Sequence, residues 1–148
     1  MDRKEQLEQF FAAYARRSNQ ALGDTPIDDV DGTVASFAGY FVEASPRGVV
    51  GGVNGDDFRA AIPQGFARYR EIGGRAMRAA RIDVSELDAF NAMVRVDWEF
   101  DYKRPRDGQT GTIAFQNIYF VNFATGEPKI FAYVTPDEAQ AMKDHGLV

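Results

Sequence analysis

The chain has two regions that differ in the spacing of their hydrophobic residues. Near the start, apolar positions recur every three or four residues, which predicts an amphipathic helix that ends near Gly23. The face of this helix comprises Leu7, Phe10, Phe11, Tyr14, Ser18 and Leu22. From residue 76 onward, apolar and polar residues alternate instead, which is typical of half-buried strands. The change of period predicts an α+β fold, with helices first and a long antiparallel sheet after them.

Two further helices are predicted before the sheet. Thr25 is a good N-cap and Pro26 suits the first helical position, so a second helix begins there. Its buried positions would be Ile27, Val30, Val34, Phe37 and Phe41. A third helix starts near Asn54, Asp56 or Asp57 and carries Phe58, Ala61, Ile62, Phe66, Tyr69 and Ile72. Pro63 inside it predicts a kink or two abutting short helices, and the glycine-rich segment 47–55 before it predicts a loop.

Four strands are predicted after residue 74. In 76–88, Ala80, Ile82 and Val84 alternate with polar residues, and in 90–103 the alternation is strict. One face of 90–103 would hold Phe90, Ala92, Val94, Val96, Trp98, Phe100 and Tyr102. The strand 110–123 is apolar on both faces and therefore needs cover on both sides. A last strand, 129–134, precedes a short C-terminal helix opened by the capping sequence Thr135–Glu138.

Composition narrows the function classes. The 148 residues predict one domain, 1–148, and the net charge of −5 argues against nucleic acid and anionic membranes as partners. Cysteine is absent and His145 is the single histidine, so no metal site or cofactor is expected. The charged N-terminus and the lack of a long apolar run predict a cytoplasmic protein that does not span a membrane. Aromatic residues are abundant, with 12 Phe, 6 Tyr and 1 Trp.

The order of elements resembles the nuclear-transport-factor-2-like superfamily, in a branch similar to SnoaL-type polyketide cyclases and ketosteroid isomerases. The residues that carry this resemblance are Val42–Pro46, Asp57-Phe58-Arg59 and the strand Trp98–Tyr102. The superfamily implies a cone, in which a curved antiparallel sheet wraps around three N-terminal helices and a short C-terminal helix follows. It also implies an apolar pocket and a homodimer formed through the sheet.

The catalytic groups of the superfamily's enzymes are largely missing from this sequence. Where the isomerases have a basic aspartate, this chain has Ser45, and an alcohol is a poor proton acceptor. Where the isomerases have their two oxyanion donors, this chain has Phe10, with Tyr14 one turn later, and Gln116, Asn117 or Ile118 on the strand. The dehydratases need two histidines, and His145 is expected to serve as a cation at a helix C-terminus.

The epoxide hydrolases of the superfamily carry an Arg-x-Asp pair that Arg95-Val96-Asp97 resembles. The last strand lacks the additional aspartate of that pattern. Arg95 and Asp97 also fall on the polar face of their strand, where a solvated position is favoured unless a bulge reverses the face.

The remaining candidates suit a pocket better than a defined reaction. Glu43, Tyr14 and Asn117 are weak catalytic candidates, and Glu43 lies close to the base position of the isomerases. A buried amide at Asn117 would need a ligand, a water or a protein partner. The candidate ligand-binding residues are Tyr14, Tyr40, Phe66, Tyr69, Trp98, Tyr102, Asn117 and Tyr119.

Three functional hypotheses follow from the sequence. The first is a small-molecule pocket protein that binds a hydrophobic, cyclic or aromatic ligand, with or without turnover. The second is a lyase, isomerase or hydrolase that uses the same pocket. The third is a non-catalytic dimerisation or interaction module whose pocket is a filled core.

Overall fold

The computed structural model describes residues 1–148, which form four helices and six strands. Their bounds, in chain order, are α1 Arg3–Leu22, α2 Val30–Ala35, β1 Phe37–Ser45, β2 Gly48–Val53, α3 Asp56–Glu71, β3 Gly74–Glu86, β4 Asn91–Lys103, β5 Thr110–Asn122, β6 Lys129–Val134 and α4 Glu138–Asp144. The mixed α+β class is confirmed. The third helix, however, follows β1 and β2, so the helices do not all precede the sheet.

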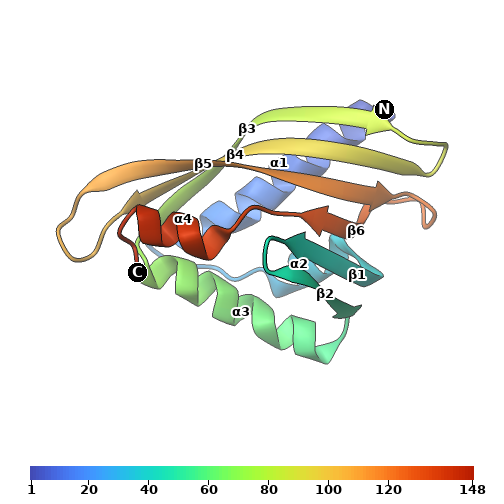
Figure 1. Ribbon diagram of the computed structural model, residues 1–148. Coiled ribbons are helices and arrows are strands. Elements are labelled where there is room, and N and C mark those ends of the chain that lie inside the picture. The colour runs from blue at the N-terminus through green and yellow to red at the C-terminus, as the bar shows by residue number, and fades with distance from the viewer.

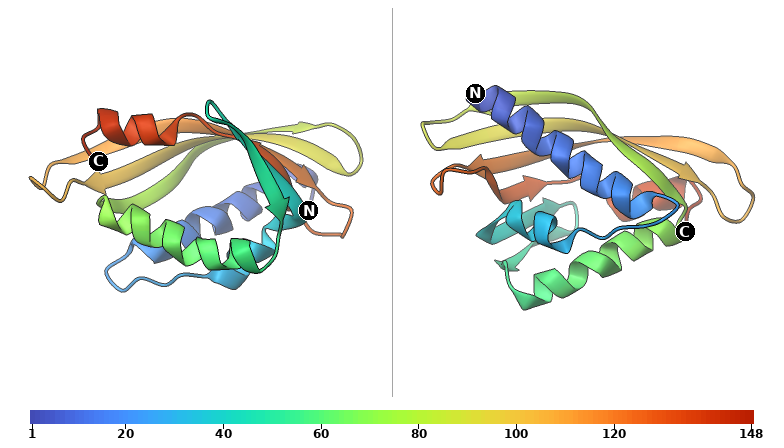
Figure 2. Two further views of the ribbon diagram at one scale, coloured as in Figure 1. Left: turned by 60° about the horizontal axis from the view of Figure 1, so that its bottom comes forward. Right: turned by 180° about the vertical axis from the view of Figure 1, so that it is seen from behind.

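All six strands belong to one curved, unclosed sheet with the order β2-β1-β6-β5-β4-β3 (Figure 1). The pairs are antiparallel except β1–β6, which is parallel, so the sheet is mixed rather than purely antiparallel. The long helices α1 and α3 lie on the same side of the sheet, and α4 lies near one end of it (Figure 2). This arrangement is consistent with the expected cone.

The predicted second helix is wrong over most of its length. Within the predicted range, only the residues of α2 are helical. The N-cap is Asp29 and not Thr25, and the Asp29 side chain accepts a hydrogen bond from the Gly32 amide. Phe37 and Phe41 belong to strand β1 and their rings lie 4.6 Å apart. A spacing of four residues places two side chains on one face of either a helix or a strand, so this pair is compatible with both.

The glycine-rich segment is also not a loop, because β2 occupies it and pairs with β1. A Cβ at Gly51 would lie 2.6 Å from the carbonyl oxygen of Phe41, so the missing side chain lets the two strands approach. Exposed Val49, Val50 and Val53 supply the β-branched residues that favour a strand.

The structure differs from two other predictions in detail. Helix α3 runs through Pro63 as a single helix, with Asp56 and Asp57 in its first turn and arginines in its last turn, where these charges favour the helix dipole. In β3 the register shifts between Ala79 and Arg81. Because of this bulge, Ala79 packs against the core while Ala80 is exposed.

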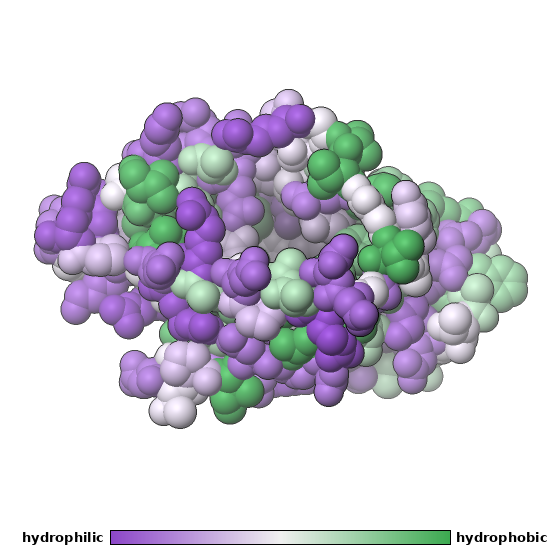
Figure 3. Space-filling view, turned by 90° about the horizontal axis from the view of Figure 1, so that it is seen from below, coloured by the Kyte–Doolittle hydropathy of each residue, from purple (hydrophilic) through white to green (hydrophobic).

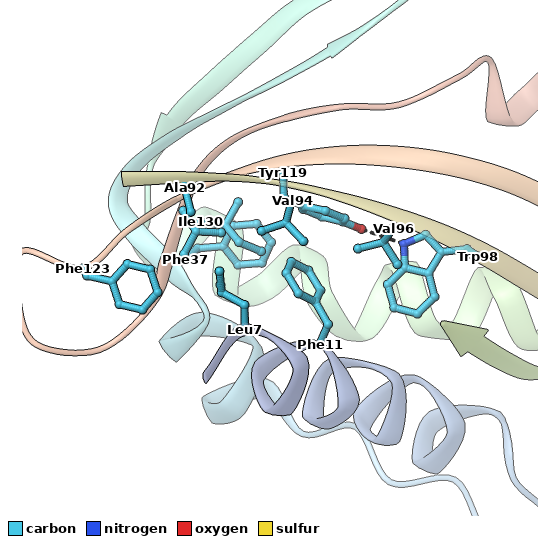
Figure 4. Packing of buried hydrophobic residues seen from close by; sticks show 11 residues of the cluster. Leu7, Phe11, Phe37, Ala92, Val94, Val96, Trp98, Tyr119, Phe123 and Ile130 are labelled. Atoms are coloured by element: carbon cyan, nitrogen blue, oxygen red, sulfur yellow. Dashed lines mark hydrogen bonds between the residues drawn. The ribbon is translucent and has the colours of Figure 1, made fainter. Parts of the chain in front are cut away.

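The main core lies between α1 and the inner face of the sheet. Leu7 and Phe11 from α1 are fully buried against alternate residues of β4, which confirms the predicted alternation except at Phe90, an exposed residue. Figure 4 shows Phe11 facing Tyr119 of β5, and their ring centroids are 4.8 Å apart. Full burial of large side chains such as Phe11 contributes about 1.5–3 kcal/mol each.

The polar face of β4 points away from the helices, as its alternation predicts. Arg95 is exposed, and Asp97 accepts a hydrogen bond of 2.7 Å from the side chain of Gln116 on the neighbouring strand. Neither residue therefore contributes to the interior. None of the four helices combines the length and hydrophobicity that crossing a membrane requires.

Candidate functional site

A cavity of about 300 Å³ lies between α1, α3, α4 and the inner face of the sheet. Twelve of its eighteen lining residues are hydrophobic. The helices contribute Tyr14, Ser18, Leu22, Phe66, Tyr69, Glu138, Ala141 and Met142. The sheet and the segment after it contribute Glu43, Met77, Phe100, Ile113, Phe115, Asn117, Tyr119, Tyr133, Thr135 and Pro136.

The cavity opens through a polar mouth. A shallower depression shares Glu43, Tyr69 and Glu138 with the cavity and adds Arg47 and Arg68. On the side of the molecule where α3 lies, the surface is hollowed, and both hydrophilic and hydrophobic residues border the hollow (Figure 3). An apolar molecule entering from this side would thus pass charged groups before reaching the aromatic walls.

Tyr119 is the centre of a buried hydrogen-bond network. Its hydroxyl oxygen accepts from Trp98 Nε1 at 3.0 Å and from Asn117 Nδ2 at 3.1 Å (Figure 4 shows the first). Because both lone pairs of that oxygen are occupied, the hydroxyl of Tyr119 can only donate to a further partner; the ring of Tyr14 lies beside it, with centroids 6.1 Å apart. Tyr119 therefore cannot accept from Tyr14, whose hydroxyl lines the cavity and can donate to a group there.

Asn117 carries a second open position. Its amide nitrogen is used by Tyr119, but Oδ1 is buried and has no protein hydrogen-bond partner. The residue is only 9% exposed. A buried carbonyl oxygen without a donor costs about 1–3 kcal/mol, so this wall favours a ligand or a water that donates a hydrogen bond.

Two carboxylates mark the mouth side of the cavity, and each accepts from a tyrosine. The hydroxyl of Tyr133 donates to Glu43 Oε2 at 3.1 Å, and the hydroxyl of Tyr69 donates to Glu138 Oε1. Neither carboxylate takes part in an ion pair. Both therefore keep acceptor capacity, Glu43 from a half-buried position on the wall and Glu138 from an exposed position at the rim.

The tyrosines that line the cavity are held in the neutral form. Burial raises the pKa of Tyr14, and the carboxylates of Glu138 and Glu43 raise it further, against the opposing effects of Arg17 and of hydrogen bonding with Tyr119. Burial, followed by Glu138, raises the pKa of Tyr69 well above its usual value. The pKa values of Tyr119 and Tyr133 are raised mainly by burial as well. These hydroxyls are therefore hydrogen-bond donors at neutral pH.

The structure brings together five of the eight candidate ligand-binding residues and all three weak catalytic candidates. Those that line the cavity are Tyr14, Phe66, Tyr69, Asn117, Tyr119 and Glu43. Trp98 lies behind the wall, fully buried, where it donates to the hydroxyl of Tyr119 and packs against the ring of Tyr14 at 5.7 Å between centroids. Tyr102 packs in a second apolar cluster beneath α4, and Tyr40 is exposed on β1.

His145 lies outside the cavity, at the C-cap of α4. Its Nδ1 atom and the hydroxyl of Tyr102 share a hydrogen bond of 3.2 Å, so the histidine joins the C-terminal helix to β4. No group of three or more histidine and carboxylate side chains is placed to hold a metal ion.

Sequence reasoning missed Tyr133 and Glu138. Counting alternate positions from buried Ile130 turns Tyr133 outward, but the β5–β6 register skips Phe131 and thereby reverses the faces. As a result Tyr133 stacks on Tyr119 with ring centroids 6.0 Å apart. Glu138 was recognised only as a capping residue, because its contact with Tyr69 depends on how α4 packs.

Comparison with solved structures identifies the fold. A ketosteroid isomerase-like protein from Erwinia carotovora atroseptica matches with TM-score 0.63 and 21% identity, over 89% of this chain and 93% of that one. A nuclear transport factor 2-like protein of unknown function from Shewanella oneidensis matches with TM-score 0.66 and 17% identity, over 90% and 98% of the two chains.

A third match is a superfamily protein of the nuclear transport factor 2-like type from Salmonella enterica serovar Typhimurium, with TM-score 0.64 and 13% identity over 91% and 92% of the two chains. No family model matches this chain, and no curated protein matches it in sequence. The chain has the nuclear-transport-factor-2-like fold, as its order of elements indicates.

Proposed function

We propose that this protein binds a hydrophobic small molecule with a cyclic or aromatic skeleton in the cavity between its helices and sheet, as a SnoaL-like pocket protein. The supporting observation is the lining, which is mainly aromatic and aliphatic but holds open polar positions at Tyr14 and Asn117. Small-molecule sites combine such apolar walls with a few polar groups that orient the ligand. The buried tyrosines are fixed by hydrogen bonds and would present a preformed surface.

Native mass spectrometry with a panel of apolar ring compounds tests this proposal. At least one compound should form a one-to-one complex. The variant Ala141→Phe, which enlarges a side chain of the cavity wall, should weaken its binding by about tenfold, or about 1.4 kcal/mol. The matched variant Ala60→Phe changes an exposed residue of α3 and should leave binding unchanged. Absence of any complex, or equal binding by both variants, would contradict the proposal.

A second candidate is an isomerase, lyase or hydrolase that acts in the same cavity. Glu43 favours it, because this half-buried carboxylate lies on the cavity wall beside the hydroxyl of Tyr133 and could act as a general base. Compounds that bind should then be converted to products, and Glu43→Gln should lower the rate by about 100-fold or more. Glu86→Gln, on the exposed end of β3, is the control. Recovery of every bound compound unchanged would rule this candidate out.

The outer face of the sheet supports a further part of the proposal, a homodimer in which a second copy covers this face. Ile118 and Phe120 of β5 point away from the core, and Phe120 lies 6.1 Å from the ring of Phe131 on β6. Val134 and Tyr40 extend the apolar surface across the sheet and are 42% and 62% exposed. An apolar face of this kind is typical of a contact surface.

Phe120→Asp should convert the dimer to a monomer, because the new carboxylate would be buried without a partner in the interface. Light scattering during size-exclusion chromatography, repeated on dilution, measures this change. The control Ala60→Asp places the same charge on an exposed position of α3, on the opposite side of the sheet, and should leave the dimer intact. A wild-type chain that is monomeric at every concentration would exclude the homodimer.

A further inference from the structure

The hydrogen-bonding groups of the cavity are unequally divided between donors and acceptors. Most hydroxyl protons are already used within the protein: Tyr69 donates to Glu138, Tyr133 to Glu43 and Ser18 to the carbonyl of Tyr14. Thr135, the threonine of the lining, donates to the carbonyl of Pro136. The proton of Tyr14 is the one that the protein leaves open, as described above.

Open acceptors outnumber this single donor. Asn117 Oδ1 is buried, unpartnered and part of the wall, so it needs a donor from inside the cavity. Glu43 and Glu138 each accept one tyrosine hydroxyl and keep their other lone pairs free. A ligand that matches this cavity therefore carries more donors than acceptors.

The charged residues around the cavity favour the same kind of ligand. No lysine, arginine or histidine lines the cavity, whereas two carboxylates do. At the mouth, Arg47 pairs with Asp137 at 3.5 Å, and Arg68 is exposed on α3, where solvent screens its charge.

On the side of α1, the guanidinium of Arg17 lies over the ring of Tyr14 and donates to Ser36 Oγ. It does not line the cavity itself but lines an adjoining depression, which shares Tyr14, Ser18, Phe66, Tyr69 and Tyr133 with the cavity. Burial is the main cause of the raised pKa values of Tyr69 and Tyr133, and the carboxylates of Glu138 and Glu43 raise them further; at Tyr14 the charge of Arg17 opposes the carboxylates.

We infer that the ligand is a hydrophobic cyclic amine whose protonated nitrogen binds the carboxylate of Glu43, with its ring against the aromatic walls. This inference rests on the proposed function and specifies its substrate class. The N–H groups of an ammonium supply the donors that the cavity lacks, and its charge complements the unpaired carboxylates. The aromatic side chains of Phe66, Phe115 and Tyr69 border the cavity, and a ring face turned to the ammonium would add attraction for it. A carboxylic acid of the same shape would be repelled.

Three probes of one shape separate charge from hydrophobicity: 2-aminotetralin, which is protonated at neutral pH, 2-methyltetralin, which is neutral, and tetralin-2-carboxylate, which is an anion. Their dissociation constants at pH 7 are measured by isothermal titration calorimetry or by competition in native mass spectrometry. We expect the amine to bind at least tenfold more tightly than the methyl compound and the carboxylate to bind most weakly. This comparison uses the unaltered protein.

Variants then identify the carboxylate that binds the ammonium group. Glu43→Gln keeps an acceptor for Tyr133 and should weaken binding of 2-aminotetralin by about tenfold, while binding of 2-methyltetralin changes less than twofold. Glu138→Gln should have a smaller effect, because this carboxylate is exposed at the rim. Glu86→Gln, which removes an exposed charge far along β3, should affect neither probe.

The outcomes distinguish this inference from the function on which it rests. Equal affinity for the amine and the methyl compound, or tightest binding of the carboxylate, would overturn the amine assignment and leave the apolar pocket in place. An amine preference that survives Glu43→Gln unchanged would overturn the role of Glu43. If the three probes and the whole ring panel fail to bind, the proposed function itself is wrong.

Discussion

Replacing Phe11 with alanine should lower the free energy of unfolding by about 3–5 kcal/mol. The Phe11 side chain is fully buried and packs at once against the ring of Tyr119 and the core between α1 and the sheet. Its removal leaves a void between rigid elements, and the neighbouring rings are held in place by their own contacts, so the space cannot collapse. Urea unfolding followed by circular dichroism measures the change.

Phe90→Ala is the matched control, because it deletes the same side chain at a position that is 57% exposed. Its effect should stay within about 0.5 kcal/mol. A loss of less than about 1.5 kcal/mol for Phe11→Ala would mean that α1 does not pack on the sheet as described.

Tyr119→Phe should destabilise the protein by about 2–4 kcal/mol, although it deletes a single oxygen atom. That oxygen accepts from Trp98 Nε1 and from Asn117 Nδ2, and both donors are buried. Without it, two N–H groups lose their acceptor inside the protein, and each unsatisfied group carries a desolvation cost. The variant keeps the ring, so the loss reports on the network rather than on packing.

Tyr69→Phe provides the comparison. Its hydroxyl donates only to Glu138, whose carboxylate is exposed and regains water when the bond is lost. The expected change is below about 1 kcal/mol. If the two variants unfold at the same urea concentration, the hydroxyl of Tyr119 is not the centre of a buried network.

Periodicity predicted the parts of this fold in which local pattern and burial agree. In β4, strict alternation placed Val94, Val96 and Trp98 on the inner face, and the structure buries all three. The same reasoning placed Asn117 on the face of Tyr119 and thus anticipated a buried amide. Such positions are predictable because a regular strand has a fixed period of two.

The missed positions lie where regular geometry breaks or where two periods coincide. Phe37 and Phe41 satisfy both a helix and a strand, so only the pairing of β1 with β2 and β6 decides between them. Tyr133 faces the cavity because β6 skips one residue in its register, and the sequence carries no local mark of that bulge. The contact of Glu138 with Tyr69 joins residues 69 positions apart, which no local pattern encodes.

The strand order also dictates when this protein completes its fold during synthesis. The hairpin of β1 and β2 joins the rest of the sheet only through β6, the last strand to leave the ribosome. Until residues 129–134 emerge, Glu43 has no Tyr133 beside it, and the open edges of β1 and β5 remain unpaired. Pairing across so many residues makes this step slow, and the nascent chain is most prone to aggregation just before it.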